Sequence, residues 1–522
     1  MRTHTLGLAS LTLLFACAMP LLTVDAGAAG MDSNAEHQDG KKEADKDKPI
    51  PPEAAISTHH SVEIGGRSIK YTATAGTLLI RDDKHNKPDA SVFYVAYSAD
   101  GIKDSSTRPL TFFYNGGPGS SSVWLHMGSF APVRVESGNA SATPPPPYRL
   151  VANHDSLLDK SDLVFIDAVG TGFSRPVGKG KGKDFWGVDQ DLDAFDKAIT
   201  RYVTLYQRWN SPKFLFGESY GTTRSAALVD QLQGHGMAFN GVVLLSSVLN
   251  YAAGSPGLDN GYIADLPTFA AIAWYHDKLP DKPAELAPFL DEVRAFARGP
   301  YAEALAKGQD LPKADEDSVA ARLHGYIGLS VQYLEEANLR VDASRFRKEL
   351  LRGERRTLGR YDARYEGIDV DAAGERPEYD PSDTAISDAF TAAFHSYLAD
   401  QLHYTSDLHY RTTAYDVIKD WDWKHKEPGQ RRPQRVPYVA GDLARAMREN
   451  PSLKVLSANG YFDLATPFFA TEYALSHMEL DPSLRNNLEL RYYPSGHMVY
   501  LNVDAQKAFK KDLAAFYDSA TR

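Results

Sequence analysis

Short apolar runs that end in small, glycine-rich or polar loops recur along the chain, and helical segments separate several of them. These runs cover residues 110–114, 163–166, 213–216, 242–245, 455–456 and 488–493. Compact apolar runs of this kind are typical of the buried strands of a parallel sheet. Between two of them, apolar residues recur at helical spacings of three and four, at Val188, Leu192, Phe195, Ile199, Tyr202 and Tyr206. The pattern predicts strands joined by helical crossovers.

Two other stretches depart from this rhythm. Residues 56–108 alternate apolar and polar positions between Gly and Asp, which predicts antiparallel strands. Residues 251–440 contain long helical runs and few strand signals, so we expect a largely helical insertion that covers the sheet as a cap. The predicted fold is α/β, with a mostly parallel central sheet flanked by helices. Its core comprises residues 56–250 and 441–522, on either side of the cap.

The N-terminus predicts export. Arg2 precedes an apolar run without charges, and small residues at 24–28 offer a cleavage site. We therefore expect residues 1–26 to be a signal peptide. The mature protein should be periplasmic or extracellular, without stable membrane insertion after cleavage. An uncleaved anchor and a lipoprotein formed through Cys17 are the alternatives. Residues 27–55 are rich in charge and proline, which predicts a disordered leader.

The composition excludes several classes of protein and several kinds of catalytic site. The 522 residues are 43% apolar and 24% charged, which excludes a wholly disordered chain and a polytopic membrane protein. The net charge of −11 argues against a general nucleic-acid binder, whose affinity depends on neutralising phosphates. Cys17, inside the predicted signal, is the single cysteine, so the mature protein should have neither disulfides nor a thiol nucleophile. The His-Glu-x-x-His pattern is missing, and we expect neither a catalytic metal nor a cofactor.

Residues 217–221 read Gly-Glu-Ser-Tyr-Gly, between an apolar strand and a helix-compatible run. In that context Gly-x-Ser-x-Gly predicts a nucleophile elbow, a strained turn that exposes a serine hydroxyl above the sheet. Ser219 is therefore the candidate nucleophile. The alternative is a tight strand–helix turn with an inert serine.

A serine hydroxyl needs a base to accept its proton, and a histidine oriented by a carboxylate is the usual solution. In hydrolases of this type the order along the chain is serine, acid, histidine. Asp463 and His497 follow late strands in that order. The alternatives are an Asx turn at Asp463 and an ordinary surface histidine at His497.

The reaction also needs donors for the negative charge that develops on the carbonyl oxygen. The backbone N–H of Tyr220, directly after the nucleophile, is one candidate. The loop 115–119, Asn-Gly-Gly-Pro-Gly, follows an earlier strand and could bring a second N–H close to a ligand. An ordinary turn is the alternative there.

Five motifs in order resemble the serine carboxypeptidase family: residues 115–121 (NGGPGSS), 167–174 (DAVGTGFS), 217–221 (GESYG), 460–463 (GYFD) and 496–499 (GHMV). The resemblance spans roughly 105–250 and 450–503. It implies an α/β-hydrolase fold with a helical cap and removal of the C-terminal residue from peptides.

The resemblance also implies roles for single residues. Ser219 would be the nucleophile, His497 the general base and acid, and Asp463 its orienting carboxylate. The N–H groups of Gly117 and Tyr220 would form the oxyanion hole.

Two further residues, Asn115 and Glu218, would hold the terminal carboxylate of the substrate. A carboxyl side chain can bind a carboxylate only when one of the two carries a proton.

Four positions depart from the family pattern. Phe113 stands where the family usually has a tryptophan whose indole N–H reaches the substrate carboxylate. Ser129 stands where a gapless count places the acid that partners the elbow glutamate. Ser120 and Thr466 replace cysteines, in keeping with the missing disulfides. The first two changes raise the question of how strictly a free C-terminus is recognised.

The sequence thus predicts an exported serine carboxypeptidase that acts on peptides with a free C-terminus through an acyl-enzyme. One rival is a serine esterase or acyltransferase with the same triad. Another is a non-catalytic binding protein on a hydrolase scaffold. The preferred terminal side chain and the oligomeric state stay open.

Overall fold

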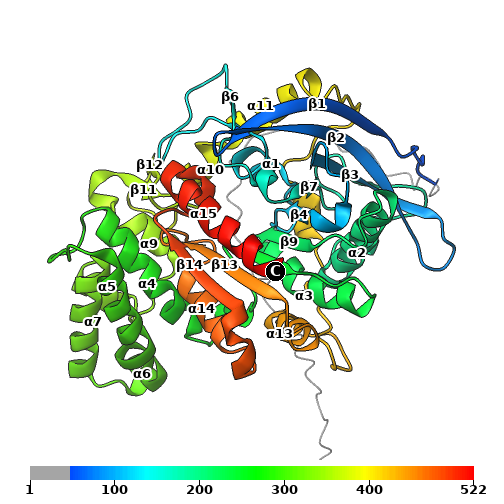
Figure 1. Cartoon of the computed structure of the whole chain (residues 1–522). Coiled ribbons are helices and arrows are strands. Elements are labelled where there is room, and N and C mark those ends of the chain that lie inside the picture. Colours follow the sequence, from blue (N-terminus) through cyan, green and yellow to red (C-terminus); the bar gives the residue numbers. More distant parts are fainter. Residues whose placement is uncertain (1–46) are drawn as a thin grey trace, which may run out of the picture.

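A computed structural model describes residues 47–522 and is built around one large mixed sheet (Figure 1). The strand order is β1-β2-β3-β7-β4-β9-β10-β13-β14, and β8 also pairs with β3. The bounds of these strands are β1 Ala55–Ile64, β2 Arg67–Arg81, β3 Pro88–Ala99, β4 Leu110–Tyr114, β7 Asp162–Ile166, β8 Arg175–Pro176, β9 Lys213–Glu218, β10 Gly241–Leu245, β13 Lys454–Gly460 and β14 Leu488–Tyr493.

The sheet has an antiparallel part and a parallel part. Strands β1, β2, β3 and β7 pair antiparallel. From β7 through β4, β9, β10 and β13 to β14 every pairing is parallel. The α/β prediction with a mostly parallel core is confirmed. All six carboxyl ends of the parallel strands meet at one edge, where ligands bind in open α/β sheets.

Helices cover both faces of the sheet. On β10, Val242 and Leu244 face one apolar cluster, and Val243 and Leu245 face the other, because side chains alternate along a strand. The first cluster contains α2 (Val188–Leu205), α3 (Tyr220–Gly234), α12 (Tyr415–Lys419) and α13 (Ala440–Glu449). The second contains α1 (Val123–Gly128), α11 (Ser387–Asp400) and α15 (Val503–Ala520).

The expected cap region, 251–440, is divided between two settings. Its first part forms a helical lobe with its own apolar cluster, which packs against Phe468 and Phe469 of α14 (Phe468–Ser476) and lies to the left of α14 in Figure 1. Helices α11 and α12 instead contribute to the two clusters on the main sheet. The lobe comprises α4 (Asn260–Tyr275), α5 (Leu286–Phe296), α6 (Ala302–Lys307), α7 (Lys313–Ile327), α8 (Val331–Glu336) and α9 (Ala343–Glu349).

Smaller elements complete the fold. One short hairpin joins β5 (Val133–Val135) to β6 (Leu150–Ala152). A second joins β11 (Arg356–Leu358) to β12 (Glu366–Ile368), followed by α10 (Pro381–Thr384).

The predicted signal peptide, 1–26, lies outside the described residues, as does most of the predicted leader. The end of that leader is bound to the core, however. The backbone N–H of Lys48 donates to Gly178 O at 2.8 Å, and the Glu53 carboxylate accepts from the guanidinium of Arg201 at 2.6 Å. Local composition could not reveal these partners, because both lie more than 100 residues away along the chain.

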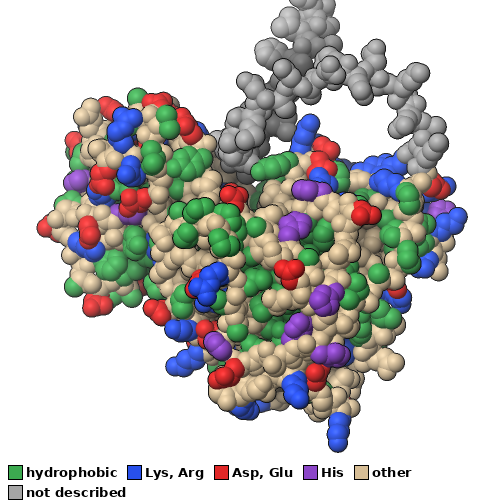
Figure 2. All heavy atoms as spheres, turned by 90° about the horizontal axis from the view of Figure 1, so that it is seen from above, with side chains coloured by type: hydrophobic (Ala, Val, Ile, Leu, Met, Phe, Trp, Pro, Cys, Tyr) green, Lys and Arg blue, Asp and Glu red, His purple; other side chains and the backbone are tan. Residues whose placement is uncertain are grey.

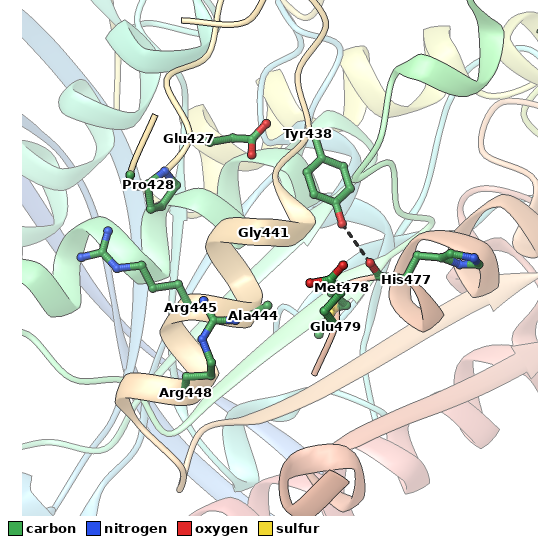
Figure 3. A pocket seen from close by; sticks show the side chains of 11 residues that line it. Glu427, Pro428, Tyr438, Gly441, Ala444, Arg445, Arg448, His477, Met478 and Glu479 are labelled. Atoms are coloured by element: carbon green, nitrogen blue, oxygen red, sulfur yellow. Dashed lines mark hydrogen bonds between the residues drawn. The ribbon is translucent and has the colours of Figure 1, made fainter. Parts of the chain in front are cut away.

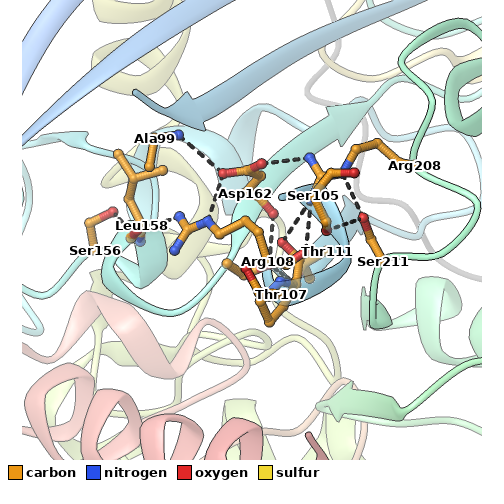
Figure 4. A network of polar contacts seen from close by, with 12 residues as sticks. Ala99, Ser105, Thr107, Arg108, Thr111, Ser156, Leu158, Asp162, Arg208 and Ser211 are labelled. Atoms are coloured by element: carbon orange, nitrogen blue, oxygen red, sulfur yellow. Dashed lines mark hydrogen bonds and ion pairs between the residues drawn. The ribbon is translucent and has the colours of Figure 1, made fainter. Parts of the chain in front are cut away.

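A buried charge network anchors the start of β7 (Figure 4). The Asp162 carboxylate accepts from Arg108 Nε at 2.9 Å and from Arg208 Nη1 at 2.6 Å. Arg108 also donates to Leu158 O, and Arg208 donates to Arg108 O. The three buried charges are therefore joined by hydrogen bonds. Buried ions need such partners, because burial removes them from water.

Acidic and basic side chains are interspersed over the coloured part of the face in Figure 2. Within residues 47–522, no helix combines the length and apolar character that a bilayer crossing demands.

Candidate active site

Ser219 lies at the junction between β9 and α3. Its φ of 61° is in the left-handed region, which is costly for a residue with a Cβ. The flanking glycines permit this turn: a Cβ at Gly217 would lie 2.1 Å from Gly221 O. The backbone N–H of Ser219 donates to Leu245 O at 3.0 Å, at the end of the neighbouring β10. This is the local geometry of a nucleophile elbow.

Asp463 and His497 form a buried pair on the loops after β13 and β14. His497 Nδ1 lies 2.8 Å from Asp463 Oδ2, and the two side chains are 2% and 0% exposed. Asp463 Oδ1 accepts from the backbone N–H groups of Ala465 and Thr466 at 2.8 and 3.0 Å. Burial disfavours the imidazolium, but the Asp463 charge and hydrogen bond outweigh it, so the pKa of His497 is raised.

Two side-chain hydrogen bonds connect the histidine loop with the ends of β9 and β10. Ser246, directly after β10, donates from Oγ to His497 O at 2.7 Å. Tyr500 donates from its hydroxyl to Glu218 Oε2, in the elbow, at 2.8 Å. The structure therefore places Ser219 and the Asp463–His497 pair at the same edge of the sheet, on neighbouring loops.

The glycine-rich loop after β4 packs against the start of α3. A Cβ at Gly116 would lie 2.3 Å from the backbone nitrogen of Tyr220, so a side chain there is impossible. Gly117 has φ of 105°, a conformation that favours glycine. The loop that should supply one oxyanion donor is thus in contact with the backbone N–H that should supply the other.

Asn115 and Glu218 are both buried, at 4% and 2% exposure. Asn115 Oδ1 accepts from the N–H of Leu125 at 3.0 Å, which orients its amide, and that amide donates to Glu218. Burial raises the pKa of Glu218 to about 7, although His497, Tyr500 and Asn115 act in the opposite direction. At neutral pH and below, a large share of Glu218 is therefore uncharged.

Tyr500 was not among the residues predicted for the site. It lies three residues after His497 and is 2% exposed. Its hydroxyl donates to Glu218, the elbow glutamate for which the sequence had offered no acidic partner. Its position next to the GHMV motif was the available signal, but a tyrosine beside a motif usually belongs to the core.

The four departures from the family pattern have structural explanations. The Phe113 ring is stacked between Phe165 and Phe216, each at 4.7 Å between centroids. Ser129 donates from Oγ to Leu125 O, and Ser120 Oγ accepts from the indole of Trp124 at 3.0 Å. Thr466 donates from Oγ1 to Asp463 Oδ2 at 2.7 Å. It thereby adds a fourth donor to the catalytic candidate Asp463, a role that we did not predict.

A surface pocket of about 610 Å³ lies elsewhere, between α13, the loop at 427–429 and residues 477–479, which follow α14 (Figure 3). It is lined by Glu427, Tyr438, Arg445 and Glu479, among others, and by none of the predicted site residues. In it the Tyr438 hydroxyl donates to His477 O at 3.3 Å. Over residues 47–522, no cluster of three or more His, Cys, Asp or Glu side chains could hold a metal ion.

Known proteins resemble this chain both in sequence and in fold. The sequence model of the serine carboxypeptidase family matches residues 73–265. The pheromone-processing carboxypeptidase KEX1 of Saccharomyces cerevisiae is 31% identical over 145 residues, which is 26% of this chain and 19% of that protein. Serine carboxypeptidase-like 45 of Arabidopsis thaliana is 29% identical over 209 residues, 38% of this chain and 39% of that protein.

The sequence match thus covers about a fifth to two fifths of these relatives. The structural match is wider. The crystal structure of the KEX1 prohormone-processing carboxypeptidase from Saccharomyces cerevisiae aligns with a TM-score of 0.52 and 15% identity, over 86% of this chain and 91% of that one. At that identity the likeness concerns the fold, which is that of the α/β hydrolases.

Proposed function

We propose that this chain, whose residues 73–265 match the sequence model of the serine carboxypeptidase family, removes C-terminal residues from peptides through an acyl-enzyme formed on Ser219. His497 takes the proton from the Ser219 hydroxyl as that oxygen attacks the scissile carbonyl. His497 then gives this proton to the leaving amine, and the C-terminal residue departs. A water molecule, activated by the same histidine, releases the shortened peptide. The mechanism uses no cofactor.

The observation that carries this proposal is the buried Asp463–His497 pair beside the Ser219 turn. Asp463 accepts four hydrogen bonds, including that of His497. These bonds fix the ring with Nδ1 toward the carboxylate and leave Nε2 for the serine proton.

We assign the stabilisation of the negative charge on the tetrahedral intermediate to the backbone N–H groups of Gly117 and Tyr220. The contact between the glycine loop and the start of α3 supports this, because both donors can then point to one oxygen. Donors fixed in advance stabilise developing charge without reorganisation.

Glu218 and Asn115 are proposed to bind the terminal carboxylate. The raised pKa of Glu218 supports this role, since a neutral carboxyl group can donate a hydrogen bond to a carboxylate. Peptides with a free C-terminus are therefore the proposed substrates. We also propose export through residues 1–26, with the periplasm or the medium as the destination.

The first test measures release of free leucine from N-blocked Phe-Leu between pH 4 and 8. Wild type and Ser219→Ala are compared, each with the free acid and the C-terminal amide. Release by wild type alone, and from the free acid alone, supports a carboxypeptidase with Ser219 as nucleophile. Equal release by Ser219→Ala would remove Ser219 from the mechanism.

The esterase or acyltransferase rival has one observation in its favour. Phe113 and Ser129 are committed to core stacking and to a backbone carbonyl, so neither contributes to carboxylate recognition. An enzyme that cleaves a simple ester but releases no leucine at any pH would favour this rival. A protein that neither cleaves the ester nor labels with a serine-directed fluorophosphonate would instead be a binding protein.

A further inference from the structure

Residues 360–363, here called the bridging segment, lie between the two loops that carry Asp463 and His497. The N–H of Leu464 donates to Arg360 O at 3.1 Å, and the N–H of Ala363 donates to Phe462 O at 3.0 Å. The N–H of His497 donates to Tyr361 O at 2.6 Å. The segment comes from the 251–440 insertion, yet its backbone is hydrogen-bonded to both catalytic loops.

The side chains of the bridging segment extend this contact. The Tyr361 ring lies 5.3 Å from the His497 ring, centroid to centroid, at an interplanar angle of 44°. The guanidinium carbon of Arg360 lies 5.4 Å from the Tyr361 centroid. Arg360 is thus stacked near a ring that itself covers the catalytic histidine candidate.

The positive charge of Arg360 acts on His497 electrostatically. Burial and the Arg360 cation both act against protonation of His497, although Asp463 outweighs them and the pKa of His497 is raised. An anion bound at Arg360 would therefore be close to the reacting groups.

Arg360 is half-buried, yet within residues 47–522 its guanidinium forms no ion pair. The nearby acids are already engaged. Asp362 pairs with Arg364 at 2.6 Å. Asp380 lies 3.8 Å from the guanidinium of Arg347 and accepts from the backbone N–H of Arg360 at 3.0 Å, and Asp383 accepts from a serine hydroxyl. Partly buried cations are normally paired, so an arginine without a carboxylate next to a catalytic site points to an anionic ligand.

We propose that Arg360 binds a carboxylate of the substrate beside the scissile bond, and that it selects peptides with an acidic side chain there. The planar guanidinium matches a carboxylate with two parallel hydrogen bonds. The inference rests on the proposed function, because it assumes that the substrate bond lies between Ser219 and His497. Asn115 and Glu218 occupy the elbow side of the site, which leaves Arg360 for a different carboxylate from the terminal one.

The test compares matched acidic and amide substrates. N-blocked Phe-Glu and Phe-Gln differ at the leaving residue, and N-blocked Glu-Leu and Gln-Leu differ at the acyl residue. Wild type should prefer the Glu member of one pair in kcat/KM by roughly tenfold or more, the range for a charge-assisted hydrogen bond. Arg360→Gln should bring that ratio to about 1, and Arg360→Lys should retain part of it. N-blocked Phe-Leu should be cleaved at a similar rate by all three.

Arg432→Gln is the matched control, because Arg432 is exposed on a loop and the substitution is the same. Its Glu-to-Gln ratio should equal that of wild type. Thermal unfolding of each variant separates a lost ligand contact from a lost fold, and Arg360→Lys keeps the positive charge at this position.

The remaining outcomes are distinct. A uniform rise in KM for every free-acid peptide in Arg360→Gln, with no change in the Glu-to-Gln ratio, assigns the terminal carboxylate to Arg360 and overturns the side-chain preference. An unchanged ratio and unchanged KM overturn the proposal entirely. If no peptide is cleaved, the proposed function fails, and nitrophenyl esters of N-blocked Glu and Gln still test Arg360 on the acyl side.

Discussion

The hydrogen bond from Tyr500 to Glu218 allows a quantitative prediction. Tyr500→Phe removes one hydroxyl from a fully buried site and keeps the aromatic ring. The hydroxyl donates to Glu218 Oε2 at 2.8 Å. Such a bond favours the charged carboxylate over the neutral acid, so its loss should raise the pKa of Glu218.

The magnitude follows from the strength of the bond. A hydrogen bond to an ionised group is roughly twice as strong as a neutral one, which is a difference of about 1 kcal/mol in a net bond of this kind. One pKa unit corresponds to about 1.4 kcal/mol, so the expected rise is about 0.7 unit. The starting pKa of Glu218 is about 7.

The sign for activity is then fixed. In its proposed role Glu218 binds the terminal carboxylate in its neutral form, so kcat/KM for a free-acid peptide should fall as pH rises through about 7. In Tyr500→Phe this fall should move to higher pH by about 0.7 unit. The acid limb, set by His497, should stay in place.

The assay is the pH profile of leucine release from N-blocked Phe-Leu. A simple ester without a free carboxylate should show no displacement of its alkaline limb in Tyr500→Phe. Tyr517→Phe is the matched control, since Tyr517 is equally buried but its hydroxyl is hydrogen-bonded to that of Thr111 and not to Glu218. An alkaline limb that does not move in Tyr500→Phe, or that moves equally for the ester, would refute the assigned role of Glu218.

Three further changes have defined outcomes. Asp463→Asn should lower kcat about 10⁴-fold while the fold is retained, measured by leucine release and circular dichroism, because the imidazole loses its orienting carboxylate; a loss under tenfold would argue against the triad. Asp162→Asn leaves Arg108 and Arg208 without their charge partner and should cost about 3–5 kcal/mol in urea unfolding; a cost below about 1 kcal/mol would contradict the buried network. Burial opposes protonation of His425, but its two carboxylate partners outweigh this and raise the pKa from 6.5 to about 9. The stabilisation, about 3 kcal/mol, should be complete below pH 6.5 and be lost as pH rises through 9, and His425→Gln should remove this pH dependence.

The parts of the fold that follow from local pattern could be predicted. The apolar runs at 110–114 and 488–493 coincide with β4 and β14. The helical spacing from Val188 coincides with α2, which ends at Leu205. The turn at Ser219 follows from two glycines and a strand boundary, all within five residues. Local structure of this kind depends on residues that are neighbours in the sequence, so it can be predicted from them.

Contacts between distant segments that no motif specifies could not be predicted. Glu218 and Tyr500 are 282 positions apart, and nothing in either neighbourhood specifies the pairing. The spacing of apolar residues in α11 shows that one face is buried, but not whether it packs on the helical lobe or on the sheet. The structure places Phe390 and Phe394 on the sheet side. The roles assigned to Ser219, Asp463, His497 and their neighbours stay predictions until the variants are measured.

The bridging segment has a consequence for engineering this scaffold. Its three backbone hydrogen bonds connect residues 360–363 with 462–464 and with 497. A graft of the insertion from a relative would replace one side of these bonds and leave the other unchanged. Exchanges meant to alter substrate preference should therefore move the three segments together, as one cassette drawn from separate parts of the gene.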